Sequence, residues 1–155
     1  GNGQQSVSFV NAFYNPTIIS LRTPLTPTGE RVAGMADVLQ DWRRCFALFA
    51  DWVHAFPEFN LLSLEDQLLL AKNRFGPFYW FICGDWSSRV GCDGVCYANG
   101  TYFPTSAALQ CLPDMNEVSK RMMELLVEPL LELKIDETER ALIASIIVFH
   151  DGWTS

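Results

Sequence analysis

The sequence predicts an all-α protein, a layered helical sandwich with one small β-hairpin, and three features carry this prediction. One long stretch repeats apolar residues at steps of three and four, the period of a helix with one buried face. A second stretch is apolar nearly all round and therefore needs cover on most sides. A single short hairpin signal separates these stretches from two further helical ones. With 155 residues, 49% of them apolar, the chain can form one domain with a core.

The first 29 residues are expected to be a flexible lead-in, and residues 30–155 a domain. The lead-in is rich in Gly, Asn, Thr and Pro, and its "TPLTPTG" run is typical of a loop or an extended segment. The chain starts without Met and lacks the basic and apolar pattern of a signal peptide. We therefore expect it to be a piece of a longer chain.

The first long helix is expected from about residue 30 up to Pro57, which cannot continue it. Its apolar stripe follows one face over about six turns. The stripe consists of Val32, Met35, Leu39, Trp42, Phe46, Phe49 and Val53.

A second, central helix is expected from Leu64 to about Trp86. Ser63, with Asp66 three residues later, forms a capping-box-like pair that satisfies free amides at the helix start. So little of this segment is polar that it should lie in the middle of a helical stack, with a bend at its internal Gly-Pro pair. Its apolar residues include Leu68, Leu69, Leu70, Phe75, Phe78, Tyr79, Trp80, Phe81 and Ile82.

The remaining third of the chain predicts a hairpin followed by two helices. In "DGVCYANGTYF", Asn99 and Gly100 are typical of a type I′ turn between short strands. A helix is expected over residues 116–133 with a kink at Pro129. Asp136 and Glu139 form a second capping box, which opens the last helix.

Charge and motif content exclude several classes of function. The net charge is −7, and phosphate binding needs clustered Lys and Arg, so no nucleic-acid contact is expected. No apolar run approaches the roughly 18 to 20 residues that span a bilayer. The histidines, His54 and His150, lie far apart, and neither a GxSxG motif nor a Gly-rich phosphate loop occurs. We therefore predict no enzyme, no catalytic residue and no membrane span.

Five cysteines, an odd number spread through apolar sequence, predict reduced thiols and an intracellular protein. Cys92 and Cys96 have a spacing that could suit a metal ion, but no second pair completes the four ligands of a zinc site. We therefore predict neither a metal site nor a cofactor.

Three separate stretches resemble the ligand-binding domain of nuclear receptors. "FADWVHAFPEFNLLSLEDQLLLAK" looks like the signature that joins that family's third helix to its fourth and fifth. "DGVCYANGTYF" resembles the family's β-turn, and "LVEPLLELKIDETERALIASIIVF" its seventh and eighth helices. The Pro129 kink and the "ELKID" junction look most like the branch of hepatocyte nuclear factor four, from which many divergent nematode receptors derive.

The resemblance covers about residues 32–149 in the same order and implies a nuclear receptor that regulates transcription. The family's ninth and tenth helices and its mobile final activation helix have no counterpart. The resemblance therefore implies a partial domain that stops after the eighth helix. Dimers are possible, but the tenth helix, which usually forms them, is among those missing.

The resemblance further implies a groove between the third and fourth helices for a coactivator or corepressor helix with an LxxLL pattern. It places the clamp for the end of that helix at His54, with Lys72 as a second basic position. Histidine departs from the family's stronger base, because it is largely neutral at pH 7. Alternatively, His54 caps its own helix and Lys72 is simply solvated. The other groove positions are Ala47, Ala50, Gln67, Leu68 and Ala71.

The resemblance also implies a hydrophobic pocket for a lipophilic ligand, either fatty-acid-like or steroid-like. Arg89 is the candidate for binding a carboxylate or hydroxyl, although the family's arginine lies a little earlier. Large aromatic residues could instead fill the space, which would leave a ligand-independent interaction module, as in an orphan or dominant-negative receptor fragment. The expected lining residues are Val38, Trp42, Cys45, Phe49, Phe75, Tyr79, Cys83, Trp86, Tyr97 and Met122.

Overall fold

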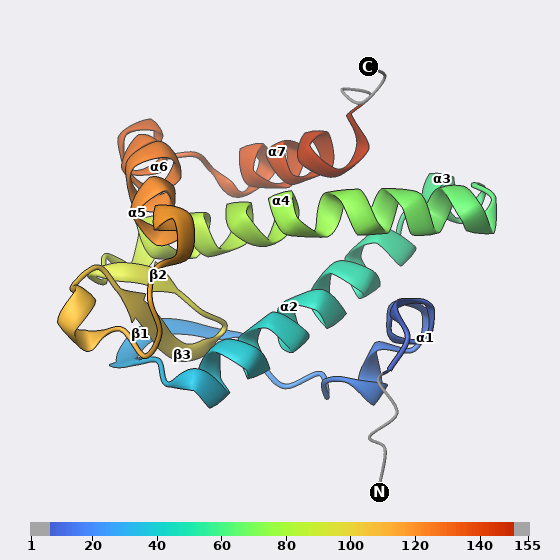
Figure 1. Ribbon diagram of the computed structural model, residues 1–155. Coiled ribbons are helices and arrows are strands. Elements are labelled where there is room, and N and C mark those ends of the chain that lie inside the picture. The colour runs from blue at the N-terminus through green and yellow to red at the C-terminus, as the bar shows by residue number, and fades with distance from the viewer. Residues whose placement is uncertain (1–6, 151–155) are drawn as a thin grey trace, which may run out of the picture.

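Three layers of helices make up the molecule in the computed structural model, which describes residues 7–150 (Figure 1). Helix α2 (Met35–His54) lies on one side of the central helix α4 (Leu64–Val90), and α7 (Glu137–Phe149) lies on the other. A small sheet packs against α4 and the start of α2 (Figure 1). The predicted helical sandwich is confirmed, but the sheet has three strands rather than the two of a hairpin.

Helix α4 is central because it contacts α2 with one face and α7 with another. Its start is capped as expected, since Ser63 Oγ accepts a hydrogen bond from the Asp66 backbone at 3.1 Å. Gly91 ends it in the left-handed conformation, with φ 73°. The helix continues through Pro77 as a single element, where the sequence predicted a bend. The short helix α3 (Pro57–Asn60) fills the corner between α2 and α4.

The sheet joins two distant parts of the chain. Strand β1 (Thr26–Val32) pairs in parallel with β3 (Asn99–Pro104), which pairs antiparallel with β2 (Gly94–Cys96). The predicted type I′ turn was wrong, because such a turn needs two residues with positive φ and only Gly100 has one, 84°. The Tyr97 N–H instead bonds the Thr101 carbonyl at 2.9 Å across a longer loop.

The N-terminal stretch, expected to be a flexible lead-in, contains regular structure. Residues Phe9–Tyr14 form helix α1, and Pro16–Ile18 form a 3₁₀ turn. The prediction that a helix starts near residue 30 was wrong by several residues, because residues 30–32 belong to β1. Helix α2 begins at Met35, where the Gly34 N–H donates to Asp37 Oδ2 at 2.8 Å.

The helix predicted over residues 116–133 is divided into shorter elements. Asn116 and Glu117 have φ values of 54° and 53°, which interrupts the helical backbone near its start. A π-helical turn precedes Pro129, whose ring and missing N–H do not fit a regular α-helix. The elements are the 3₁₀ turn Met115–Glu117, helix α5 (Val118–Met122), the π-helical turn Met123–Val127 and helix α6 (Glu128–Leu133). A separate 3₁₀ turn, Ala107–Leu109, precedes them.

The capping box of the last helix is confirmed. Asp136 Oδ1 accepts from the Glu139 N–H at 2.8 Å, and Glu139 Oε1 accepts from the Asp136 N–H at 3.1 Å. Both free amides are therefore satisfied where α7 begins, and this fixes its start beside α4.

Candidate functional site

The predicted groove positions lie at the C-terminal end of α2 and the N-terminal end of α4. Both ends belong to one apolar cluster, since Ala50 and Ala71 are buried in it and Leu68 packs against it. Ala47, Ala50 and Ala71 are all fully buried. Ala47, Ala50 and His54 come from α2, and Gln67, Leu68, Ala71 and Lys72 come from α4.

Helix α1 covers this surface with two aromatic side chains. The Phe13 side chain is 0% exposed. The centre of its ring lies 4.5 Å from the centre of the His54 ring and 5.9 Å from that of the Phe59 ring. The Phe9 ring meets Phe46 of α2 edge to face at 5.5 Å. The predicted groove is therefore occupied by a segment of the chain itself.

Two polar contacts accompany these rings. The Tyr14 hydroxyl donates to Gln67 Oε1 at 2.7 Å. Gln67 Nε2 in turn donates to the backbone carbonyls of Phe59 and Leu62 at 3.3 and 3.1 Å. The Lys72 ammonium lies 5.6 Å from the centre of the Phe9 ring, within cation–π range. Three of the predicted groove residues thus contact α1.

His54 caps its own helix, as the alternative reading of this residue had it. Its Nδ1 lies 2.7 Å from the Ala50 carbonyl oxygen. Its Nε2 is buried and has no hydrogen-bond partner within residues 7–150. That nitrogen is the one polar atom of the ring left for a helix end lying in the groove. Lys72 is exposed and remains free to move towards such an end.

Six of the predicted ligand-binding residues gather in one apolar cluster beneath the sheet. Cys83, Tyr97 and Met122 are buried there with Phe103 of β3. The rings and chains around them come from α2, α4 and the sheet, which the sequence separates widely. The six residues, which we call the predicted pocket cluster, are Val38, Tyr79, Cys83, Trp86, Tyr97 and Met122.

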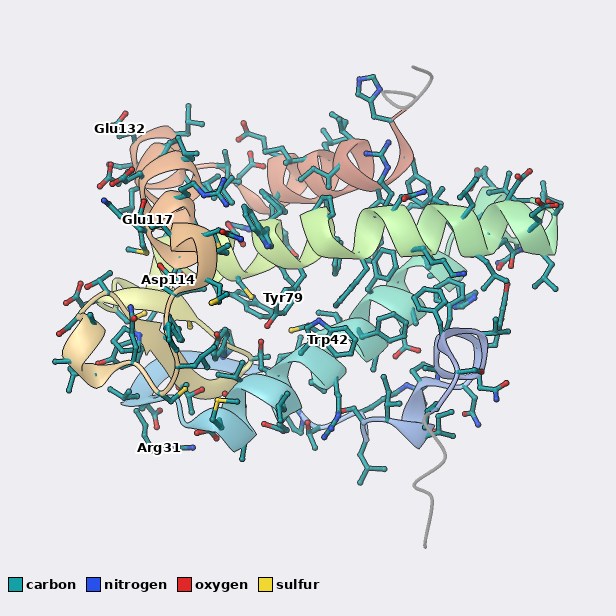
Figure 2. The ribbon with its side chains drawn as sticks, in the orientation of Figure 1. Arg31, Trp42, Tyr79, Asp114, Glu117 and Glu132 are labelled. Atoms are coloured by element: carbon teal, nitrogen blue, oxygen red, sulfur yellow. The ribbon has the colours of Figure 1, made fainter. Side chains whose placement is uncertain are left out.

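Aromatic rings fill the space between α2 and α4 where the ligand was expected. Trp42 and Tyr79 both project into this space (Figure 2). The centre of the Phe75 ring lies 5.6 Å from the ring centre of each of them and 5.5 Å from that of Phe49. Cys45 is fully buried, whereas half of Trp42 is exposed. This close packing supports the filled-pocket alternative.

Three cavities in the described part of the chain lie elsewhere. One of about 630 Å³ is lined by residues of α3 and α4 together with Phe149, and one of about 930 Å³ lies beside α5 and the preceding loop. The third, of about 550 Å³, lies on the outer face of α7 beside the exposed Leu142 and Ile146. Predicted ligand-binding residues line none of these three cavities.

Arg89 forms a structural ion pair instead of facing the predicted pocket cluster. Its guanidinium lies 2.8 Å from Oδ2 of Asp85, one helical turn earlier, and half of its side chain is exposed. The same oxygen lies 2.6 Å from Arg140 of α7. Asp85 is almost fully buried, so the two arginines neutralise a carboxylate between layers.

Asp41 is a buried polar residue that the sequence reasoning missed. Its carboxylate accepts hydrogen bonds from the Tyr79 hydroxyl, from the Ala98 N–H at 2.7 Å and from the Cys45 thiol at 3.6 Å. Burial raises the pKa of the Asp41 carboxyl, although these donors oppose the rise. The spacing of the helix could have revealed it. Asp41 is three residues after Val38 and four before Cys45, so it shares a helical face with two predicted pocket residues.

Cys83 belongs to the predicted pocket cluster, and Cys45 and Cys96 are also buried. Burial raises the pKa of the Cys83 thiol, whereas a hydrogen bond from Cys96 lowers the pKa of Cys92 to about 7. Within residues 7–150, no three His, Cys, Asp or Glu side chains are grouped so as to hold a metal ion. None of the described helices combines the length and apolar character needed to cross a membrane.

Comparison with known proteins identifies the family of this chain. The chain matches the family described as the ligand-binding domain of nuclear hormone receptor over residues 26–154. It belongs to this family, whose members regulate transcription.

Similar proteins include two nuclear hormone receptors of Caenorhabditis elegans. Family member nhr-61 is 39% identical over 153 residues, covering 92% of this chain and 37% of the relative. Family member nhr-4 is 31% identical over 145 residues, covering 93% and 30%. Human hepatocyte nuclear factor 4-gamma is 24% identical over 134 residues, covering 84% and 32%. The chain thus spans about a third of the length of these relatives.

Proposed function

We propose that this chain is the helix-binding part of a nuclear hormone receptor, which acts in the nucleus by presenting a groove to coactivator or corepressor helices. Family membership supports the regulation of transcription. One observation supports the groove: the surface formed by α2 and α4 holds an amphipathic helix in the structure, namely α1. A surface that seats one such helix has the shape and apolar character for another.

Electrostatics support the same groove. The C-terminus of a bound helix exposes carbonyl oxygens and carries partial negative charge, which favours nearby cations. Lys72 and the free Nε2 of His54 lie at the two helix ends that form the groove. We propose that these two groups hold the last carbonyls of the partner helix.

Binding of a fluorescein-labelled LxxLL peptide with acidic flanking residues, followed by fluorescence anisotropy, tests this function. Reversing the charge with Lys72→Glu should weaken binding at least fivefold, although the loss of the Lys72–Phe9 contact works in the opposite direction. Lys120→Glu, an equally exposed reversal on α5, should leave the affinity unchanged. Equal affinities for wild type and Lys72→Glu would remove Lys72 from the groove.

A lipophilic ligand is the second candidate function, favoured by the convergence of six predicted residues in one cluster. Its binding requires the rings of Phe75 and Tyr79 to move, because they now fill the space next to α2. The packed interior therefore favours regulation without a ligand. Native mass spectrometry of the purified protein separates the two, since a copurified fatty acid or sterol would add its mass to the chain.

A further inference from the structure

We propose that α1 is a built-in competitor for the coregulator groove, which a partner helix must displace in order to bind. This inference rests on the proposed function and adds a mode of regulation to it. In this arrangement the resting chain is autoinhibited, and anything that releases α1 raises its affinity for helical peptides.

The sequence of α1 presents the same apolar spacing as a groove-binding helix. Phe9, Ala12 and Phe13 stand at positions i, i+3 and i+4, so they share one face. Ala12 and Phe13 are buried and Phe9 packs against the same cluster, whereas Val10 and Asn11 are exposed. The helix is therefore seated by its apolar face.

The contacts of α1 engage the residues that a partner helix would need. Phe13 covers the His54 ring, and Phe9 lies under the Lys72 ammonium. Tyr14 uses the Gln67 side-chain oxygen. An incoming helix cannot reach His54 and Gln67 while α1 is present, although Lys72 stays exposed, so the two occupants exclude each other.

Helix α1 has little helical stability of its own. It has six residues, and isolated helices shorter than about 12 residues are marginal in water. Its cap is a single hydrogen bond from the Asn11 N–H to Ser8 Oγ at 3.1 Å, and Asn15 and Pro16 end it at once. Its helical form therefore depends on the groove. Release of α1 exposes the buried Phe13 side chain, so a partner helix has to replace these apolar contacts.

The connection between α1 and the sheet is anchored at a point that allows this opening. Arg44 of α2 is largely buried, and its Nε donates to the Thr23 carbonyl at 2.9 Å. Beyond this anchor, β1 is held by its pairing with β3. Release of residues 9–18 therefore need not break the pairing of β1 with β3. Because the chain tethers α1, it returns at high effective concentration, which lowers the apparent affinity of a partner.

Variants of α1 in the full chain test this competition with the labelled LxxLL peptide. Phe9→Lys places a cation beside Lys72, and Phe13→Asp places a charge in an apolar site. Both should release α1 and strengthen peptide binding at least tenfold. Val10→Asp, on the exposed face of α1, is the matched control and should leave the affinity unchanged. Thermal melting confirms that each variant is folded, and Phe9→Lys, at a half-buried position, serves if Phe13→Asp is not.

Amide hydrogen exchange of the wild-type chain supplies a second readout. Added peptide should speed exchange in residues 9–14 while slowing it at the C-terminal end of α2. If the peptide binds wild type and Phe9→Lys equally, or binds without speeding exchange in α1, the competition is refuted and the proposed function stands. If no variant binds although α1 exchanges freely, both the groove function and this inference are refuted.

Discussion

Nε of Arg140 lies 2.6 Å from Oδ2 of Asp85 and thereby joins α7 to the central helix α4. The Asp85 carboxylate is almost fully buried, and its other oxygen has no hydrogen-bond partner among the described residues. Within residues 7–150, the other cation paired with it is the half-exposed Arg89. Arg140 therefore adds a charged contact to the apolar packing between the two layers.

Replacing this arginine should loosen the contact between the layers. We expect Arg140→Gln to lower the free energy of unfolding by about 2 kcal/mol, because a buried charge loses its best-placed hydrogen bond. Urea denaturation followed by tryptophan fluorescence measures this change. Arg22→Gln removes the exposed pair with Asp51 and should cost much less, because solvent screens that pair. Equal losses for the two variants would contradict the structural role of Asp85.

The buried carboxyl of Asp41 should make stability depend on pH. Burial raises the pKa of Asp41 above its ordinary value of 3.8. At a pH between the unfolded and the folded pKa, the folded state therefore retains a proton that the unfolded state has lost. The contribution of Asp41 is therefore complete below the ordinary pKa and declines as pH rises through the folded value. The difference in unfolding free energy between wild type and Asp41→Asn should fall as pH increases from about 4. A difference that grows with pH would show that the pKa is lowered.

The low pKa of Cys92, about 7, should make this thiol selectively reactive. Iodoacetamide modifies thiolates, so its rate of reaction with Cys92 should rise through neutral pH. The buried Cys45 and Cys83 should remain unmodified in the folded protein. Peptide mapping by mass spectrometry in a Cys111→Ser background measures each site without interference from the exposed fifth cysteine. A Cys96→Ala variant should shift the profile of Cys92 to higher pH, because the thiol donor is lost.

Gly94 should tolerate no side chain. A Cβ placed there would lie 2.1 Å from the Phe103 carbonyl oxygen, across the pairing of β2 with β3. We expect Gly94→Ala to destabilise the chain by more than about 3 kcal/mol, since the strands must separate to admit the methyl group. Gly34→Ala is at the cap of α2, where a Cβ would make only ordinary contacts. It should cost a small fraction of the free energy lost in Gly94→Ala. Thermal unfolding of both variants tests the contrast.

Local signals explain which elements the sequence predicted correctly. The starts of α4 and α7 depend on side chains three residues apart, Ser63 with Asp66 and Asp136 with Glu139, so a short window contains the whole cause. Strand β1 is different, because its partner β3 lies about 70 residues later and its Pro27 and Gly29 have low strand propensity. Only the folded chain brings these two segments together.

The residues of the candidate groove could be predicted from the sequence, but the segment that occupies it could not. The groove residues follow from one continuous signature, and the structure places them at two adjoining helix ends. Their occupant could not be inferred from that signature, since Tyr14 meets Gln67 across 53 positions. The apolar spacing of Phe9, Ala12 and Phe13 was readable, but no local rule assigns a short amphipathic helix to one particular surface. Likewise, the sequence listed large side chains for the pocket without fixing whether they fill it.

The outer face of α7 has a practical consequence for any solution experiment. Leu142 and Ile146 each leave 58% of their surface in contact with water. Burying such surface is favourable in proportion to its area, so we expect copies of the chain to associate through it at high concentration. The melting temperature of the purified chain should therefore rise with its concentration, and a mild detergent should remove that dependence.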